Sequence, residues 1–274
     1  MSNALFIGKV YYRFDELPST NDWAADFIAS GQKSAAKTRP PEGTVIRAAN
    51  QTAGKGQLGS RWQSKPGENL LLSIILYPNW LPAQKQFYLS MSVALALRDL
   101  IADHITPTTQ GTGHHAEELS PTSVQIKWPN DLYLGNQKTA GILIQNSLAG
   151  STLQSSIIGI GLNVNQLEFP AELPHATSLA RTYGVAFDTD TVTELLFTCL
   201  ERRYLQLKAG RFSDLKAAYE GQLWRRGTLT RFIRQADGSS FEGIINGVDE
   251  SGNLLVQTEN GVNSFEVKEI SPIL

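Results

Sequence analysis

The sequence predicts an α+β protein, in which a mixed, largely antiparallel sheet with flanking helices is followed by a small C-terminal β-barrel. Three observations predict this class. Short apolar runs of strand length recur between segments of helical periodicity, glycine-containing hairpin turns join several neighbouring strands, and only short strands follow Trp224. Because short strands bury little surface on their own, we expect the barrel to lean on the main domain. We place the domains at residues 1–223 and 224–274.

The strands of the main domain are expected where apolar or alternating residues stop at turn signals. Residues 7–17 alternate and are rich in Tyr and Phe, and Pro18 ends them. Residues 70–77 are an almost continuous apolar run, which is typical of a central strand. The other strands are expected at residues 44–48, 124–128, 132–134, 142–145 and 153–162. Hairpin turns separate the last three, at residues 134–137 and 149–151.

The helices are expected from capping residues and from apolar residues at helical spacing. Residues 19–22 can cap a helix that begins near Trp23, and residues 83–104 have the clearest helical spacing. Further helices are expected at residues 191–207 and 212–223. Residues 106–121 form a polar insert, and we interpret its histidine and glutamate pairs as a solvated loop rather than a metal site.

The C-terminal region has strand signals separated by turn signals. The strands are expected at residues 231–234, 241–246, 253–258 and 264–270. The turns between them are Asp-Gly, Ser-Gly and Asn-Gly, in which the glycine supplies the positive φ that a tight turn needs.

Composition and charge exclude several classes of protein. A hydrophobic share of 41% and a charged share of 18% exclude disorder of the chain as a whole. The net charge of −2 argues against DNA or an anionic membrane as a partner. The single cysteine, Cys199, can form neither an internal disulfide nor a thiolate metal cluster. No apolar run approaches the roughly 20 residues of a membrane span, and no signal peptide is evident, so we expect a cytoplasmic protein.

The first chemical feature is a loop rich in glycine, Gly54-Lys55-Gly56-Gln57-Leu58-Gly59. No helix opens at its last glycine and no acidic residue lies about 20 positions further on, which excludes a dinucleotide site. A Walker motif is excluded because no Gly-Lys-Ser/Thr occurs. Two interpretations remain: a mobile loop whose amides and lysine approach a phosphate, or a plain surface loop.

The second feature is Lys127-Trp128-Pro129-Asn130-Asp131, followed by Lys138 just after a hairpin turn. Asn130 and Asp131 lie at strand tips, where their side chains can bind a ribose or a divalent cation. Taken alone, each half is better explained as an ordinary turn or an ordinary exposed lysine. Together, two lysines, a carboxylate and loop amides suit phosphoryl or nucleotidyl transfer, which depends mainly on positioning and charge stabilisation.

Four motifs in order resemble those of the biotin protein ligases. They are Ser19-Thr20-Asn21, the stretch from Gln51 to Trp62, the stretch Lys127 to Asp131 with Lys138 to Leu143, and Gly159 to Asn165. The resemblance covers about residues 17–165, and the region from about residue 225 resembles the small SH3-like domain of that family. It implies the biotin/lipoate ligase catalytic fold, which is similar to class II synthetases.

The resemblance implies a reaction in two steps. Biotin and ATP form biotinyl-5′-AMP and pyrophosphate with Mg²⁺ as cofactor, and the biotin then passes to a lysine of a biotin carboxyl carrier domain. It also implies site residues. Lys138 and Lys55 are the catalytic residues, and Asp131 is a candidate Mg²⁺ ligand. The biotin site consists of Ser19, Thr20, Asn21, Gln51, Lys55, Gly56, Gln57, Lys138 and Gly141. The nucleotide site consists of Gly54, Lys55, Gly59, Trp62, Asn130, Asp131 and Asn163.

Two departures from the family pattern affect these expectations. Members with the fullest motif have arginines where this loop has Lys55 and Gln57, so the loop is expected to hold the adenylate less tightly. Only 18 residues precede Ser19, which is too few for the winged helix-turn-helix of the repressor members, so no DNA-binding role is expected.

Alternatives to a biotin protein ligase remain open. A lipoate–protein ligase shares the fold and the adenylation chemistry, but should lack the Lys-Trp-Pro-Asn-Asp turn and the terminal barrel in this form. An octanoyl transferase needs an active-site cysteine, and Cys199 lies in an apolar helix. A catalytically inactive biotin-binding protein is a third alternative, and a homodimer is left open.

Overall fold

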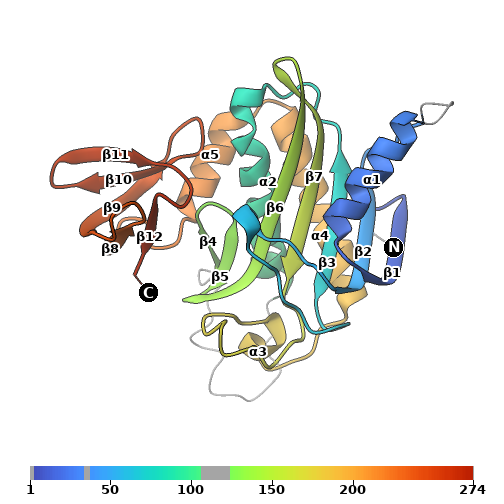
Figure 1. The fold of residues 1–274 in the computed structure, drawn as a ribbon, viewed down its shortest axis with the longest axis horizontal. Coiled ribbons are helices and arrows are strands. Elements are labelled where there is room, and N and C mark those ends of the chain that lie inside the picture. Colours follow the sequence, from blue (N-terminus) through green and yellow to red (C-terminus); the bar gives the residue numbers. More distant parts are fainter. Residues whose placement is uncertain (1–2, 34–37, 106–123, 274) are drawn as a thin grey trace.

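The computed structural model describes residues 3–33, 38–105 and 124–273. The polar insert with its histidine pair lies outside these residues. The main domain contains a seven-stranded sheet in the order β1-β2-β3-β7-β6-β5-β4 (Figure 1). Its strands are β1 (Tyr11–Leu17), β2 (Thr44–Gln51), β3 (Leu70–Leu76), β4 (Val124–Lys127), β5 (Asp131–Leu134), β6 (Gln137–Ala149) and β7 (Thr152–Leu162). Only β1 and β2 are parallel among these neighbours, which confirms the predicted mixed, largely antiparallel sheet.

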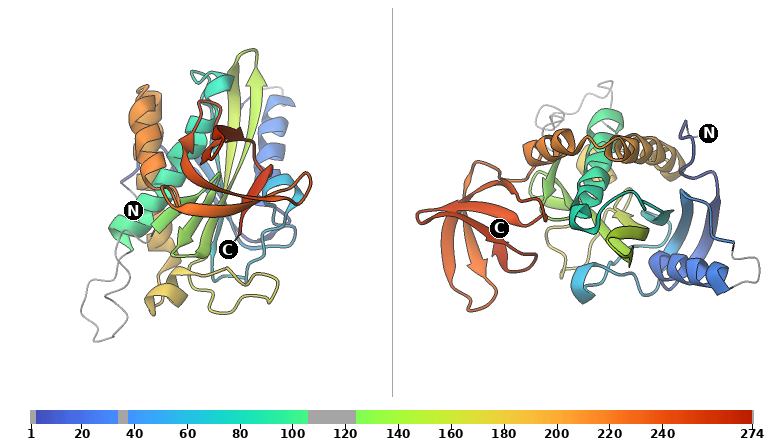
Figure 2. Two further views of the ribbon diagram at one scale, coloured as in Figure 1. Left: turned by 90° about the vertical axis from the view of Figure 1, so that its left-hand side faces the viewer. Right: turned by 90° about the horizontal axis from the view of Figure 1, so that it is seen from above.

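The helices cover both faces of this sheet (Figure 2). They are α1 (Thr20–Lys33), α2 (Phe87–Asp99), α3 (Leu179–Tyr183), α4 (Thr189–Lys208) and α5 (Phe212–Gly221). A 3-10 turn (Ala83–Lys85) precedes α2 and a π-helical turn (Leu100–His104) follows it, as expected for residues 83–104. Helix α3 was not predicted, because five residues are too few to show a helical period. Among the described residues, no helix combines the length and apolar character that a membrane span requires.

The side chains of β3 alternate between two apolar cores, and this explains the continuous apolar run. Leu70, Leu72 and Ile74 belong to the large core that α2 and α4 cover. Ile75 points the other way and joins the smaller core, which contains Ile28 of α1. Since β3 is buried on both faces, every position in it is apolar apart from Ser73.

The first strand begins later than predicted, at Tyr11 rather than at residue 7. The amides of Phe6 and Ile7 donate to the carboxylate of Glu201 on α4, and Gly8 has a φ of 79°. These contacts turn the chain away from the sheet before it can pair as a strand.

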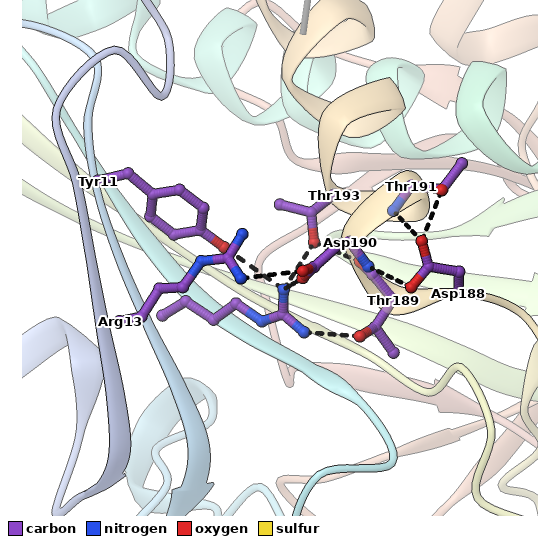
Figure 3. A network of polar contacts seen from close by, with 8 residues as sticks. Tyr11, Arg13, Asp188, Thr189, Asp190, Thr191 and Thr193 are labelled. Atoms are coloured by element: carbon purple, nitrogen blue, oxygen red, sulfur yellow. Dashed lines mark hydrogen bonds and ion pairs between the residues drawn. The ribbon is translucent and has the colours of Figure 1, made fainter. Parts of the chain in front are cut away.

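A polar network ties β1 and β2 to the start of α4 (Figure 3). The Asp190 carboxylate accepts hydrogen bonds from Arg13 at 2.9 Å and from Arg47 at 2.5 Å, and Arg47 also donates to Thr189. Asp188 caps α4 by accepting from the amide of Thr191 at 3.1 Å. The hydrogen bond from Arg13 is the largest of the effects that lower the pKa of Asp190.

The C-terminal domain is a five-stranded antiparallel sheet in the order β11-β10-β9-β8-β12. Its strands are β8 (Leu229–Arg234), β9 (Ser240–Val248), β10 (Leu254–Thr258), β11 (Gly261–Phe265) and β12 (Ile270–Pro272). Phe232, Phe241 and Phe265 stack in its interior. The predicted strand at residues 264–270 was wrong. Lys268 has a φ of 66°, and the amide of Glu269 donates to the carbonyl of Glu266, so a turn separates β11 from β12.

Hydrogen bonds join the two domains directly. The Trp128 indole N–H donates to the carbonyl of Gly252 at 2.8 Å, and the Tyr88 hydroxyl donates to Glu250 at 2.9 Å. Figure 1 shows the C-terminal sheet beside β4 and β5, at one end of the main sheet. The C-terminal domain is therefore held next to the cavity described below.

Candidate active site

A cavity of about 810 Å³, including its part open to solvent, lies on the face of the main sheet that carries α1. The cavity exists because glycines of β6 and β7 place no side chains on this part of the sheet. On β7, Ile157 packs in the core under α1, while Gly159 and Gly161 follow on the same face. Gly161 is paired with Gly141 of β6, so two adjacent strands present bare backbone. The cavity is lined by Ser19, Thr20, Asn21, Gln51, Lys55, Gly56, Gln57, Ser60, Arg61, Trp62, Leu72, Asn130, Asp131, Lys138, Gly141, Ile142, Leu143, Gly159, Ile160, Gly161 and Lys268.

The first turn of α1 forms a polar wall of this cavity. Ser19 caps the helix, since its hydroxyl accepts from the amide of Asp22 at 3.3 Å. Helix α1 starts at Thr20, slightly before the predicted start near Trp23. Thr20 and Asn21 are each 3% exposed, so these polar groups lie inside the protein and need partners.

Three further side chains hold that wall in place. The side-chain Oε1 of Gln51 accepts from the backbone amide of Thr20 at 2.7 Å. Ser73 Oγ lies 2.7 Å from Thr20 Oγ1 and 2.5 Å from Asn21 Oδ1, and Asn21 Nδ2 donates to Gln145 at 3.0 Å. Donors and acceptors are thus fixed before any ligand arrives, which suits recognition of a small polar ring.

The glycine-rich loop, for which the sequence left a phosphate-binding loop and a plain surface loop open, forms a short hairpin. The amide of Trp62 donates to the carbonyl of Gly54 at 3.0 Å, and the amide of Gly56 donates to the carbonyl of Ser60 at 2.8 Å. A 3-10 turn (Gln57–Gly59) forms its tip. Because two of its amides bond inside the hairpin, they do not face a phosphate in this conformation.

The Trp62 side chain lies on the glycine floor of the cavity. A Cβ atom would come within 2.4 Å of the indole at Gly161 and within 2.9 Å at Gly141, so only glycine leaves room for the ring. In the part of the chain that the structure describes, the buried Trp62 indole N–H has no hydrogen-bond partner. That N–H is therefore an unsatisfied donor inside the protein.

Lys138 and Asp131 form an ion pair on the other wall of the cavity. Their charged atoms are 2.7 Å apart, and the side chains are 34% and 20% exposed. The backbone of Lys138 is held by two hydrogen bonds. Its amide donates to the backbone carbonyl of His175, and its carbonyl accepts from the backbone amide of Thr177. Asn130 Nδ2 donates to the carbonyl of Ile142 at 2.6 Å. These bonds make the rigid support for Lys138 that the hairpin turn predicted.

The first residues of this motif, which precede Asn130, contact other parts of the protein. Lys127 does not line this cavity: its Nζ donates to the Tyr133 hydroxyl at 2.9 Å and lies 5.6 Å from the Trp224 ring. Burial lowers the pKa of Lys127. Together with the hydrogen bond of Trp128 to Gly252, these contacts place the start of the motif at the domain interface.

Most of the site residues expected from the sequence come together in this one cavity, and three do not line it. Gly54 and Gly59 shape the hairpin, and Gly59 has a φ of 83°. Asn163 is 3% exposed, and its Nδ2 donates to the carbonyl of Thr177 at 3.0 Å. Lys55 lines the cavity and also pairs with Asp22 at 2.6 Å.

Sequence reasoning missed Ser73, Gln145, Gly159 and Lys268 as parts of the site. One signal was available for Ser73, since a serine interrupts the apolar run Leu-Leu-Leu-Ser-Ile-Ile-Leu. A buried hydroxyl in a central strand needs a partner, and here the partners are the residues of the polar wall.

The donor set does not form a metal cage. Among the described residues, no three His, Cys, Asp or Glu side chains are grouped to hold a metal ion. Asp131 is the single carboxylate among the described residues that line the cavity. Mg²⁺ commonly binds through one or two carboxylates together with substrate phosphates, so this arrangement fits a metal that arrives with a nucleotide.

Comparison with known proteins identifies the family to which this chain belongs. Residues 17–163 match the Biotin/lipoate A/B protein ligase family, and residues 231–268 match the Biotin protein ligase C terminal domain. The chain belongs to the biotin/lipoate A/B protein ligase family. Its second match points to the biotin branch of that family, and the named relatives agree.

Two relatives and one solved structure illustrate the similarity. The chain is 35% identical over 251 residues to the Bifunctional ligase/repressor BirA of Bacillus subtilis, covering 89% of this chain and 72% of that protein. It is 29% identical over 248 residues to the Biotin--[acetyl-CoA-carboxylase] ligase of Mycobacterium tuberculosis, covering 90% and 84% of the two chains. The structure resembles the biotin protein ligase from Aquifex aeolicus in complex with biotin and ATP, with a TM-score of 0.73, 26% identity and coverage of 97% and 99%. These similarities confirm the predicted fold class.

Proposed function

We propose that this chain is a biotin protein ligase, which activates biotin with ATP and transfers it to a lysine of a biotin carboxyl carrier domain. One observation carries the proposal: the motifs that are far apart in the sequence line one cavity, with a prearranged polar wall and a lysine on a rigid strand. Relatives that are named biotin ligases, and a similar structure with bound biotin and ATP, support it.

In the first step, a carboxylate oxygen of biotin attacks the α-phosphorus of ATP, and the bond to pyrophosphate breaks. We assign the polar wall of Ser19, Thr20, Asn21 and Gln51 to the ureido ring of biotin, because it offers donors and acceptors that are held in place by neighbouring side chains. Lys138 would stabilise the negative charge that develops between the carboxylate and the α-phosphate. Its pairing with Asp131 keeps the ammonium in position until the substrates bind.

The glycine-rich hairpin would cover the mixed anhydride and exclude water from it. Lys55, Arg61 and Trp62 line the cavity from this hairpin, so they are its candidate contacts with the adenylate. We assign Asn130 and Asp131 to the nucleotide side. Mg²⁺ bound there would offset phosphate charge, with Asp131 as its protein ligand.

In the second step, the amine of a carrier lysine attacks the carbonyl carbon of the anhydride, AMP leaves with the bonding electrons, and the amine loses a proton. The carrier lysine must reach the carboxyl end of biotin, which lies by Lys138 in this assignment. The hairpin therefore has to open, or to leave a passage at that point.

Measuring the release of pyrophosphate from ATP tests this function. The purified protein should release pyrophosphate from ATP when biotin is added, and much less when lipoate is added. It should then attach biotin to a carrier domain that retains its target lysine. Release that depends on lipoate would show a lipoate ligase. Binding of biotin without any release would show an inactive biotin-binding protein.

A further inference from the structure

The glycine-rich hairpin, residues 54–62, is joined to the start of α1 in two places. At the base of the hairpin, the amide of Ala53 donates to the carbonyl of Pro18 at 2.9 Å. Further along the first arm, Lys55 Nζ donates to Asp22 Oδ1 at 2.6 Å. Among the described residues of the hairpin, Lys55 is the one whose side chain is hydrogen-bonded to another element. The ion pair therefore holds the part of the hairpin that lies beyond its base.

Asp22 lies on a rigid part of the protein. It is in the first turn of α1, where a negative charge is favourable near the helix N-terminus. Its amide donates to the hydroxyl of Ser19, which caps the helix. The two residues immediately before it, Thr20 and Asn21, are buried in the polar wall of the cavity. A single helical turn therefore carries both the polar wall and the carboxylate that contacts the hairpin.

The hairpin itself brings two cations together. Lys55 and Arg61 are directly opposite each other in an antiparallel bridge, and side chains in such a pair lie on the same face. Like charges in this arrangement destabilise the pairing of the two arms. Because Asp22 offsets the charge of Lys55, its carboxylate stabilises the hairpin as well as the contact of the hairpin with α1.

The strength of this ion pair suits a closure that has to be reversed. The side chains of Lys55 and Asp22 are 47% and 44% exposed, and an ion pair with this exposure shifts an equilibrium by about fivefold at most. Such a contact slows the opening of the hairpin without preventing it. Opening is required in the second step, because the carrier lysine must reach the bound intermediate.

We propose that Asp22 is a positioning residue for the reaction: its ion pair with Lys55 holds the hairpin closed, and thereby retains biotinyl-5′-AMP until the carrier lysine arrives. This inference rests on the proposed function for the identity of the retained molecule. The ammonium of Lys55 then acts on Asp22 rather than on the phosphate of the adenylate, which narrows its role among the candidate contacts of the hairpin.

The dissociation rate of a non-hydrolysable analogue of biotinyl-5′-AMP tests the proposal without turnover. Asp22→Asn should speed dissociation about two- to fivefold, because it removes the ion pair. A direct contact of Lys55 with the phosphate predicts the opposite sign, since Asp22→Asn would free the ammonium and remove a negative charge near the anion. Lys55→Gln and the double variant should match Asp22→Asn, because all three lose the same interaction. Asp26→Asn, at an exposed position one turn further along α1, is the matched control.

Exchange of the two charges separates this contact from a general effect on the helix. Asp22→Lys should speed dissociation more than Asp22→Asn, because it places two cations together, and the addition of Lys55→Asp should reverse most of that change. A change in the hairpin would not repair a helix that is weakened at its N-terminus, nor replace a lost contact with phosphate. The difference between Asp22→Asn and the unmodified protein should also shrink as the salt concentration rises, since salt screens exposed ion pairs.

Slower or unchanged dissociation from Asp22→Asn would overturn the proposal. So would an exchanged pair from which the analogue dissociates as fast as from Asp22→Lys. Failure of the proposed function looks different: biotin would cause no pyrophosphate release although the analogue binds, and the Asp22 series would still give its answer. If the unmodified protein does not bind the analogue, both ideas fail.

Discussion

Replacing Lys138 with alanine should abolish most of the first step while leaving the fold intact. Removal of one preorganised donor to a developing charge typically costs about 2.7–4 kcal/mol, which is about a hundred- to a thousandfold in rate. The structure adds to this loss, because Asp131 would keep its negative charge beside the incoming anions without its partner at 2.7 Å. We therefore expect pyrophosphate release to fall about a thousandfold, mainly in kcat. Since both side chains are partly exposed, the free energy of unfolding should change by less than about 1 kcal/mol.

The assay is pyrophosphate release at saturating biotin and ATP, with thermal unfolding of the same samples. Lys65→Ala is a suitable control, because Lys65 is an exposed lysine that also has a carboxylate partner, Glu68 at 3.0 Å, and it does not line the cavity. Lys138→Arg keeps the charge in a different shape and should recover part of the rate. Release by Lys138→Ala within about threefold of the unmodified protein would refute the assigned role of this lysine.

Three other predictions follow from the geometry. Gly161→Ala should reduce adenylate formation at least tenfold, because the new Cβ atom would lie 2.4 Å from the Trp62 ring and displace the hairpin; normal activity would contradict this. Because the pKa of Asp190 is lowered in the folded protein, its carboxylate contributes stability at pH values above the ordinary pKa of aspartate. That contribution disappears as the pH falls through the pKa of the folded state. Asp190→Asn should thus lower the melting temperature at pH 7 and progressively less as the pH falls below the ordinary aspartate range, and an effect that does not change with pH would count against the network with Arg13. Gln57→Arg should slow dissociation of biotinyl-adenylate about tenfold or more, because it adds a charge-assisted hydrogen bond; an unchanged rate would mean that the charge of the hairpin does not control retention.

The sequence predicts the main sheet well because each strand has a local signal. The apolar run at β3 and the hairpin turns before β6 and β7 depend on residues close together in the chain. The predicted positive φ at the turn glycines of the C-terminal domain is also confirmed, with values of 71° at Gly238 and 92° at Gly252.

Local patterns fail where a distant contact decides the conformation. Residues 7–10 were included in the predicted first strand, yet the amides of Phe6 and Ile7 donate to Glu201, almost two hundred residues further on. The turn at Lys268 has no glycine or proline to mark it, and the strand prediction therefore ran through it. In both places, tertiary hydrogen bonds override the local preference.

The candidate site likewise has a part that the sequence predicts and a part that depends on contacts between distant residues. Its motif residues can be found in the sequence because each motif is continuous, but the residues that hold or complete them come from elsewhere. Ser73 and Gln145 support Asn21 across 52 and 124 positions of sequence. The continuous motif itself proves to serve two purposes, since Asn130 and Asp131 line the cavity while Trp128 donates to the C-terminal domain. A change at Trp128 should therefore alter the site through the position of Lys268, an effect that no spacing of residues within the motif could reveal.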